Sequence, residues 1–138
     1  MPTITRRVLL NDVDAAGVVF YARIMAIAHE CYEEAMAGSG LGLDALIRAG
    51  RIGLPLVHAD ADFSHPLRHG DQVACSVCCE TIGTKSFTIR VDLTVLGAEP
   101  RAAATVRQIH ACVDMDRLQS MPLPADLRAK LTALAPVA

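Results

Sequence analysis

Residues 11–21 read Asn-Asp-Val-Asp-Ala-Ala-Gly-Val-Val-Phe-Tyr and separate a predicted strand from a predicted long helix. Before them, residues 3–10 alternate loosely between two faces, which indicates a β-strand. After them, apolar residues of the segment 22–36 recur three or four positions apart, which indicates a largely buried helix. These apolar residues are Ile24, Ile27, Ala28, Cys31 and Ala35. Two carboxylates and a glycine therefore stand at a strand-to-helix corner.

The composition predicts a folded domain with an aliphatic core. Of the 138 residues, 52% are hydrophobic, but only 4% are aromatic and none is Trp. A single domain over residues 1–138 is the simplest interpretation of this length. The net charge of −2 provides no basic field for nucleic acid, so we expect no nucleic-acid partner.

The sequence also carries no predicted membrane or export segment. No apolar stretch approaches the roughly 18 residues of a transmembrane helix, and residues 1–7 lack the apolar core of a signal peptide. Five cysteines, an odd number, suit a reducing compartment. We therefore expect a cytoplasmic protein without a membrane span.

The rest of the chain predicts one antiparallel sheet. The remaining segments with strand periodicity are 54–63, 72–81, 85–96 and 101–114, and those with helical periodicity are 43–49 and 125–134. In the last strand, Val106 is out of phase with Ile109 and Val113, which we attribute to a bulge. The expected fold class is α+β, with about five antiparallel strands whose apolar face is covered by the one long helix.

Asp14 is the main candidate for chemistry at the corner. A carboxylate beside the free N–H groups of a helix start is in place to attack a carbonyl that these groups polarise, or to deliver water to it. The alternative is that Asp14 is a helix N-cap, a position where Asp is favoured, and Asp12 is able to take either role. Gly17 permits close approach of a ligand, and the apolar residues 18–20 predict a dry pocket wall.

Each histidine has an ordinary structural interpretation. We expect His29 on the surface of the long helix and His58 in a cross-sheet hydrogen bond. His65 and His69 flank a turn and are expected in solvent, and His110 is expected in a hydrogen bond or an interface. The histidines do not show the spacing of a metal site.

Two further motifs invite a functional interpretation. Cys75-x-x-Cys78 matches some zinc and redox sites, but in a strand these side chains point to opposite faces, so we predict small buried residues instead. Lys85 opens a strand after a turn, where it is either a solvated lysine or a contact for a phosphate. The sequence contains no P-loop, dinucleotide-binding or α/β-hydrolase motif.

Residues 12–21 (Asp-Val-Asp-Ala-Ala-Gly-Val-Val-Phe-Tyr) resemble the signature of hotdog-fold acyl-CoA thioesterases of the 4-hydroxybenzoyl-CoA thioesterase family. The predicted order of one strand, a long helix and four strands is similar to this family over nearly the whole chain. Within the family, residues 27–34, 54–59 and 62–63 look most like the 1,4-dihydroxy-2-naphthoyl-CoA hydrolases, which serve phylloquinone and menaquinone synthesis. The resemblance implies a hotdog fold, in which the sheet wraps around the central helix.

The resemblance also implies roles for particular residues. Asp14 matches the catalytic carboxylate, the amide of Tyr21 helps to hold the thioester oxygen, and Gly17 shapes the approach. His58 is assigned to substrate binding and Lys85 to the phosphates of coenzyme A. The family implies dimers or tetramers with active sites between subunits. It implies no metal or redox cofactor, coenzyme A being part of the substrate.

The expected reaction is hydrolysis of an aromatic acyl-CoA to the free acid and coenzyme A. The residues do not distinguish attack by Asp14 from activation of water by it. The first expectation for the substrate is 1,4-dihydroxy-2-naphthoyl-CoA, and 4-hydroxybenzoyl-CoA or short-chain acyl-CoAs are alternatives. Two rivals are a non-catalytic acyl-CoA-binding hotdog protein and a dehydratase, in which His29 or His58 would have to meet an acid.

Overall fold

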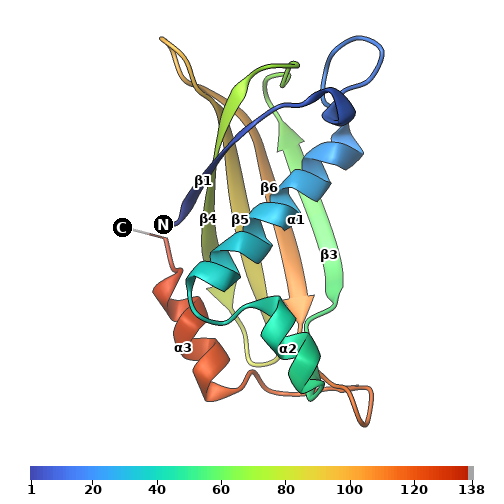
Figure 1. Cartoon of the computed structure of the whole chain (residues 1–138). Coiled ribbons are helices and arrows are strands. Elements are labelled where there is room, and N and C mark those ends of the chain that lie inside the picture. Colours follow the sequence, from blue (N-terminus) through green and yellow to red (C-terminus); the bar gives the residue numbers. More distant parts are fainter. Residues whose placement is uncertain (137–138) are drawn as a thin grey trace.

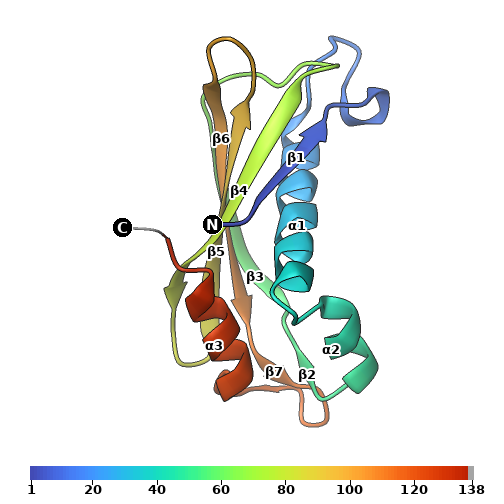
Figure 2. The same cartoon turned by 60° about the vertical axis from the view of Figure 1, so that its left-hand side comes forward.

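The long helix α1, Tyr21–Gly38, crosses one face of a five-stranded antiparallel sheet in the computed structural model, which describes residues 1–136 (Figure 1). The strands lie in the order β1 (Thr3–Arg7), β4 (Gln72–Ile82), β5 (Ser86–Val95), β6 (Arg101–Ala111) and β3 (Leu56–Phe63). A second view shows α1 on one side of the sheet only (Figure 2). The predicted α+β class and the five-stranded antiparallel sheet are confirmed.

The short elements gather at the two ends of the sheet. The 3-10 helix η1 (Leu10–Asp12) lies at the end where α1 begins. At the other end lie α2 (Leu43–Ala49), α3 (Ala125–Ala133) and a small antiparallel sheet of β2 (Ile52–Gly53), β7 (Val113–Asp114) and β8 (Gln119–Ser120). The last predicted strand is therefore divided at Cys112. Within residues 1–136, no helix is long and apolar enough to cross a membrane.

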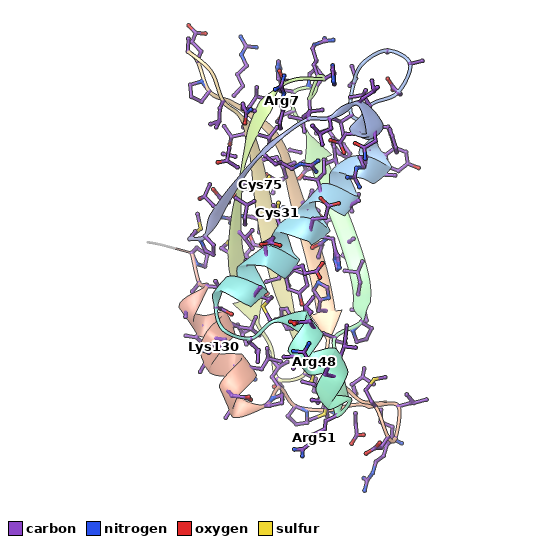
Figure 3. The ribbon with its side chains drawn as sticks, in the orientation of Figure 1. Arg7, Cys31, Arg48, Arg51, Cys75 and Lys130 are labelled. Carbon is purple, nitrogen blue, oxygen red and sulfur yellow. The ribbon has the colours of Figure 1, made fainter. Side chains whose placement is uncertain are left out.

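The core lies between α1 and the sheet and is mostly aliphatic. The five apolar residues that predicted the helix are all buried. Opposite them, the inward side chains of β4 and β5 include Val77, Val91 and Leu93. All five cysteines are buried with free thiols, as predicted for Cys75 and Cys78. The thiols of Cys31 on α1 and Cys75 on β4 meet between helix and sheet (Figure 3).

The predicted bulge in β6 is present, but the reason given for it was wrong. The register between β5 and β6 shifts so that Ala103 has no partner. Beyond that point the alternation is regular, because Val106, Gln108 and His110 are all buried and Ile109 faces the other side. The hydrophobic alternation of the sequence is interrupted because two inward positions, 108 and 110, carry polar side chains.

The strand β3 is one edge of the sheet, and among residues 1–136 it pairs only with β6. Its side chains Leu56, Val57 and Phe63 are exposed, and Val57 has 60% of its surface accessible. The outer face of the sheet is polar, and there Glu80 accepts hydrogen bonds from Arg90 (3.2 Å) and Arg107 (2.9 Å). An apolar edge strand is a ready template for pairing with another strand.

Candidate active site

Asp12 is a buried carboxylate that connects the predicted strand and helix at the corner. Its carboxylate is fully buried and accepts hydrogen bonds from Arg23 Nε (2.7 Å), Arg6 Nη2 (2.9 Å) and the N–H of Leu9 (2.8 Å). Burial alone would raise the pKa of Asp12, but the Leu9 N–H and the guanidinium groups of Arg23 and Arg6 together lower it. Because Arg23 belongs to the first turn of α1, this network holds the end of β1 and the start of α1 together.

Asp14 stands on an exposed turn two residues further along. Its Oδ1 accepts hydrogen bonds from the N–H groups of Ala16 (2.9 Å) and Val18 (3.4 Å). The N–H of Gly17 donates to the Asp14 carbonyl oxygen (3.0 Å), and Gly17 has a φ of +77°, which favours glycine. The other carboxylate oxygen, Oδ2, forms no hydrogen bond within residues 1–136, so it is free to meet a ligand.

Among residues 1–136, no side chain caps the start of α1. The N-cap position is held by Phe20, so the alternative that Asp14 or Asp12 caps this helix is wrong. The amides of Arg23 and Ile24 bond to the carbonyl oxygen of Phe20. In the part of the chain that the structure describes, the amides of Tyr21 and Ala22 have no acceptor. These free donors suit a ligand oxygen that gains negative charge.

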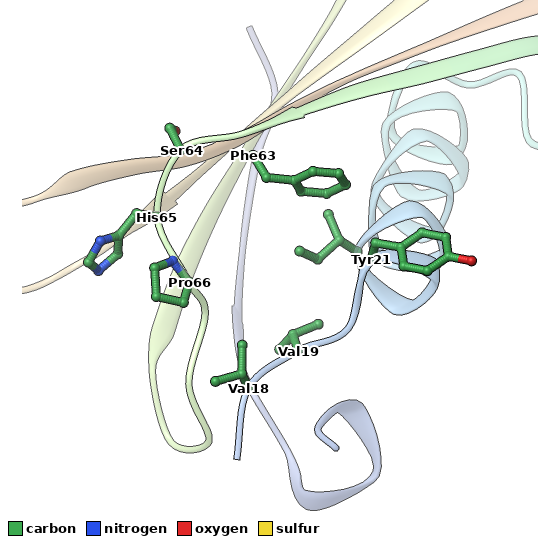
Figure 4. A pocket seen from close by; sticks show the side chains of 8 residues that line it. Val18, Val19, Tyr21, Phe63, Ser64, His65 and Pro66 are labelled. Carbon is green, nitrogen blue, oxygen red and sulfur yellow. The ribbon is translucent and has the colours of Figure 1, made fainter. Parts of the chain in front are cut away.

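A cavity of about 390 Å³ opens beside the helix start (Figure 4). One side is formed by Val18, Val19 and Ile24, so two of the three residues 18–20 expected to form an apolar wall do so, while Phe20 is not among the lining residues. The other side is formed by the segment 63–66, which runs from Phe63 to Pro66. Figure 4 shows the Phe63 ring turned toward α1. Asp14 is exposed and is not among the residues that line this cavity, so one chain does not enclose the carboxylate and the cavity in a single site.

The structure does not bring His58 or Lys85 together with Asp14 in one chain. His58 is exposed on the face of β3 away from α1, since its partner on β6 is Ile109, and its Nε2 lies 3.1 Å from Asp60 Oδ2. Lys85 precedes β5 at the far end of the sheet. The 11 residues of β4 separate that end from the corner, a distance of about 35 Å. The roles assigned to both residues stay predictions.

His65 was expected in solvent and His29 on the surface of the long helix, where it was considered only for the dehydratase rival. His65 is half-buried and lines the cavity. His29 is half-buried on α1, with its ring centroid 5.5 Å from that of Tyr32 and 6.1 Å from that of His110. His110 is buried and its Nδ1 donates to the carbonyl oxygen of Leu54 (3.1 Å), as its expected hydrogen-bonded role required.

Comparison with known proteins identifies the family. Residues 8–131 match the family model of the thioesterase-like superfamily. The chain belongs to this superfamily. It is 34% identical over 125 residues to the 1,4-dihydroxy-2-naphthoyl-CoA hydrolase of Nostoc punctiforme, covering 91% of this chain and 82% of the relative. It is 36% identical over 124 residues to the enzyme of the same name from Synechococcus elongatus, covering 89% of each.

Solved structures of the thioesterase-like superfamily confirm the hotdog fold. Slr0204, a 1,4-dihydroxy-2-naphthoyl-CoA thioesterase from Synechocystis, superposes with a TM-score of 0.88 at 28% identity and covers 96% of both chains. The BH1999 gentisyl-coenzyme A thioesterase superposes with a TM-score of 0.82 at 25% identity, covering 94% of this chain and 99% of that one. The sheet and the central helix are thus shared over nearly the whole length.

In this thioesterase-like chain, the corner offers a carboxylate and a pair of amides on neighbouring segments. The carboxylate of Asp14 has one oxygen held by its own turn and one free, and the free amides of Tyr21 and Ala22 start the helix. No group of three metal-ligating side chains occurs among residues 1–136. The arrangement is suited to attack on a polarised carbonyl by a carboxylate or by water.

Proposed function

We propose that this protein is an acyl-CoA thioesterase that hydrolyses an aromatic acyl-CoA, with 1,4-dihydroxy-2-naphthoyl-CoA as the preferred substrate. The products are the free acid and coenzyme A, and the reaction serves menaquinone or phylloquinone synthesis in a reducing cytoplasm. The observation that carries the proposal is the free Asp14 carboxylate on the turn that leads into the uncapped start of α1. The relatives named as 1,4-dihydroxy-2-naphthoyl-CoA hydrolases support the choice of substrate.

In the proposed mechanism the amide of Tyr21 donates to the thioester oxygen. Such oriented donors gain strength as charge develops on that oxygen, and losing one elsewhere costs on the order of 3 kcal/mol. Asp14 either attacks the carbonyl carbon, giving a mixed anhydride that water then hydrolyses, or takes a proton from an attacking water. In both routes the carbon–sulfur bond breaks and coenzyme A leaves as the thiolate, which needs no strong general acid.

The proposed active form is an oligomer, a dimer or a tetramer, in which two copies pair along β3. The exposed apolar side chains of this edge support this arrangement, as does the exposed position of Asp14, which a second copy would cover. A two-fold axis through the middle of the paired strands makes the two β3 strands antiparallel. The Leu56 end of one β3 then lies beside the Phe63 end of the other. The Leu56 end of one chain then covers the Asp14 corner of its neighbour. The same axis brings Lys85 toward that corner, where it is able to meet a coenzyme A phosphate.

The substitution Asp14→Asn tests the proposed function. Asn keeps the oxygen that accepts from Ala16 and Val18, so the turn is retained while the charge is lost. We expect a folded variant whose kcat for release of free thiol falls by at least about 100-fold. Asp114→Asn is the matched control, because Asp114 Oδ1 also accepts from two amides of its own turn, at the opposite end of the sheet.

A variant Asp14→Asn with near wild-type turnover would overturn the role of Asp14. A wild-type protein that binds acyl-CoA esters yet releases no thiol would instead identify the rival, a non-catalytic acyl-CoA-binding protein. A panel of 1,4-dihydroxy-2-naphthoyl, 4-hydroxybenzoyl and short-chain CoA esters, compared by kcat/KM, tests the preferred substrate. Single-turnover hydrolysis in labelled water distinguishes the two routes, since label enters Asp14 only through the anhydride.

A further inference from the structure

Three buried polar side chains form a cluster beneath α1. They are Tyr32 on α1 with Gln108 and His110 on β6, and each is at most 2% exposed. Within residues 1–136, no hydrogen-bond partner is available to Tyr32 Oη, Gln108 Oε1 or His110 Nε2. An unpaired polar group in a protein interior costs roughly 1–3 kcal/mol. Three such groups in one place therefore require a reason, and we refer to these residues as the polar cluster.

Packing holds the members of the polar cluster close together. The ring of Tyr32 stacks on that of His110, with centroids 4.5 Å apart and planes inclined by 22°. Phe87 packs on the same histidine ring, with centroids 5.4 Å apart. Gln108 lies two residues before His110, so the two side chains share the inward face of β6.

The hydrogen-bonding capacity of the polar cluster defines what it is able to bind. His110 Nδ1 lies 3.1 Å from the carbonyl oxygen of Leu54, which only accepts, so Nδ1 carries the hydrogen. Burial lowers the pKa of His110, which keeps the ring neutral and leaves Nε2 as an acceptor. Gln108 Oε1 is a second acceptor, and the Tyr32 hydroxyl either donates or accepts. A hydroxyl group complements this set, whereas a carboxylate, which only accepts, does not.

The polar cluster lies one side-chain layer below the surface beside β3. The cross-strand neighbours on β3 are Ala59 for Gln108 and Leu56 for His110. Ala59 is small and half-buried, and Leu56 is 48% exposed. On the other side stands the half-buried ring of His29. Ala59 and Leu56 therefore separate the polar cluster from the β3 edge, and a ligand at that edge would reach the cluster only if Leu56 turned aside.

We propose that the polar cluster binds a ring hydroxyl of the aromatic acyl group whose thioester is held at Asp14 of a second copy of the chain. This inference rests on the proposed function and on pairing along β3, which sets the Leu56 end of one copy at the Asp14 corner of the other. The ring hydroxyl donates to His110 Nε2 or Gln108 Oε1 and accepts from Tyr32 Oη. An unhydroxylated ring leaves these groups unpaired, so the polar cluster selects hydroxylated aryl esters.

The test compares 1,4-dihydroxy-2-naphthoyl-CoA with 2-naphthoyl-CoA, which lacks both hydroxyl groups. We expect the wild type to favour the hydroxylated ester at least tenfold in kcat/KM, since sites that bind a substrate hydroxyl reject analogues without it. Gln108→Met keeps the length of the side chain and removes the acceptor, and it should lower this preference at least fivefold. Tyr32→Phe, which keeps the stacked ring, should lower it in the same direction. Gln72→Met, on an exposed glutamine of β4, is the matched control and should keep the wild-type preference.

Two outcomes would overturn the inference. If Gln108→Met and Tyr32→Phe both keep the wild-type preference for the hydroxylated ester, the polar cluster does not bind the ring hydroxyl and holds internal water instead. If Gln108→Met fails to fold, Tyr32→Phe decides alone, and an unchanged preference in it has the same meaning. A wild type that hydrolyses neither ester is a different result, because it contradicts the proposed function and this inference falls with it.

Discussion

At the scale of single residues, Asp12 is the most tightly held charge of the corner. Asp12→Ala leaves two guanidinium groups and the N–H of Leu9 without their acceptor. We expect the free energy of unfolding to fall by about 2–4 kcal/mol, measured by urea denaturation. Asp44→Ala, which breaks an exposed helical ion pair with Arg48, should cost less than about 0.5 kcal/mol. Equal losses in the two variants would refute the structural role of Asp12.

His110 makes stability depend on pH. Burial lowers its pKa, so below its unfolded value of about 6.5 the unfolded chain takes up a proton that the folded chain does not. The free energy of unfolding should therefore fall as the pH drops from about 7 toward 5. His110→Asn retains an N–H for the carbonyl oxygen of Leu54 but does not titrate. Urea denaturation at several pH values should show a flatter dependence in this variant, and an equally steep one would assign the effect to other groups.

The residues that meet at the corner could be predicted from the sequence, but their geometry could not. The two carboxylates, Gly17 and the apolar residues after it are adjacent in the chain, so their proximity is local. Asp12 is buried between two arginines, whereas Asp14 is exposed on a turn. The difference depends on Arg6 and Arg23, which only the folded chain brings within hydrogen-bond distance of Asp12. The capping alternative failed because six residues separate Asp14 from the first turn of α1.

At the scale of elements, α2 ends at Gly50 in the left-handed conformation. Its φ of +66° suits glycine, and the N–H of Gly50 bonds to the carbonyl oxygen of Leu46. Gly50→Ala should lower the free energy of unfolding by about 1 kcal/mol, through the strain of a side chain in this region. Gly97→Ala is the control, because Gly97 has no left-handed φ and open space around its Cα, and should be nearly neutral in the same thermal or urea denaturation. A neutral Gly50→Ala would contradict the expected strain.

The periodicity of hydrophobic residues predicted most helices and strands, and the places where it failed share one cause, the burial of polar side chains. The stripe of α1 and the alternation of β5 predicted their buried faces, since hydrophobic side chains occupy the inward positions. In β6 the inward positions 108 and 110 carry Gln and His, so hydrophobicity alone did not reveal the regular alternation that leaves Ile109 on the other face. The polar cluster was missed for the same reason, because no local pattern marks a polar residue as buried.

At the scale of the whole molecule, the unpaired edge of β3 predicts the oligomer. Val57→Lys places a charge on this exposed apolar edge, a common way in which edge strands avoid pairing. We expect the variant to sediment as a monomer in analytical ultracentrifugation and to lose thioesterase activity together with the dimer. Ile47→Lys, on α2 and 78% exposed, is the matched control and should keep both. A fully dimeric, active Val57→Lys would place the interface elsewhere.

The burial of every cysteine has a practical consequence for measuring this enzyme. All five thiols are at most 2% exposed, so a reagent does not reach them while the chain stays folded. Burial also raises the pKa of Cys79 to about 12 and raises the pKa of Cys78 and Cys112. A chromogenic disulfide reagent added to the native protein therefore titrates released coenzyme A against a low background. The chain has no tryptophan whose fluorescence could report unfolding. The same reagent can instead measure the rate of global unfolding, because the five cysteine thiols of each chain react only when the core is exposed.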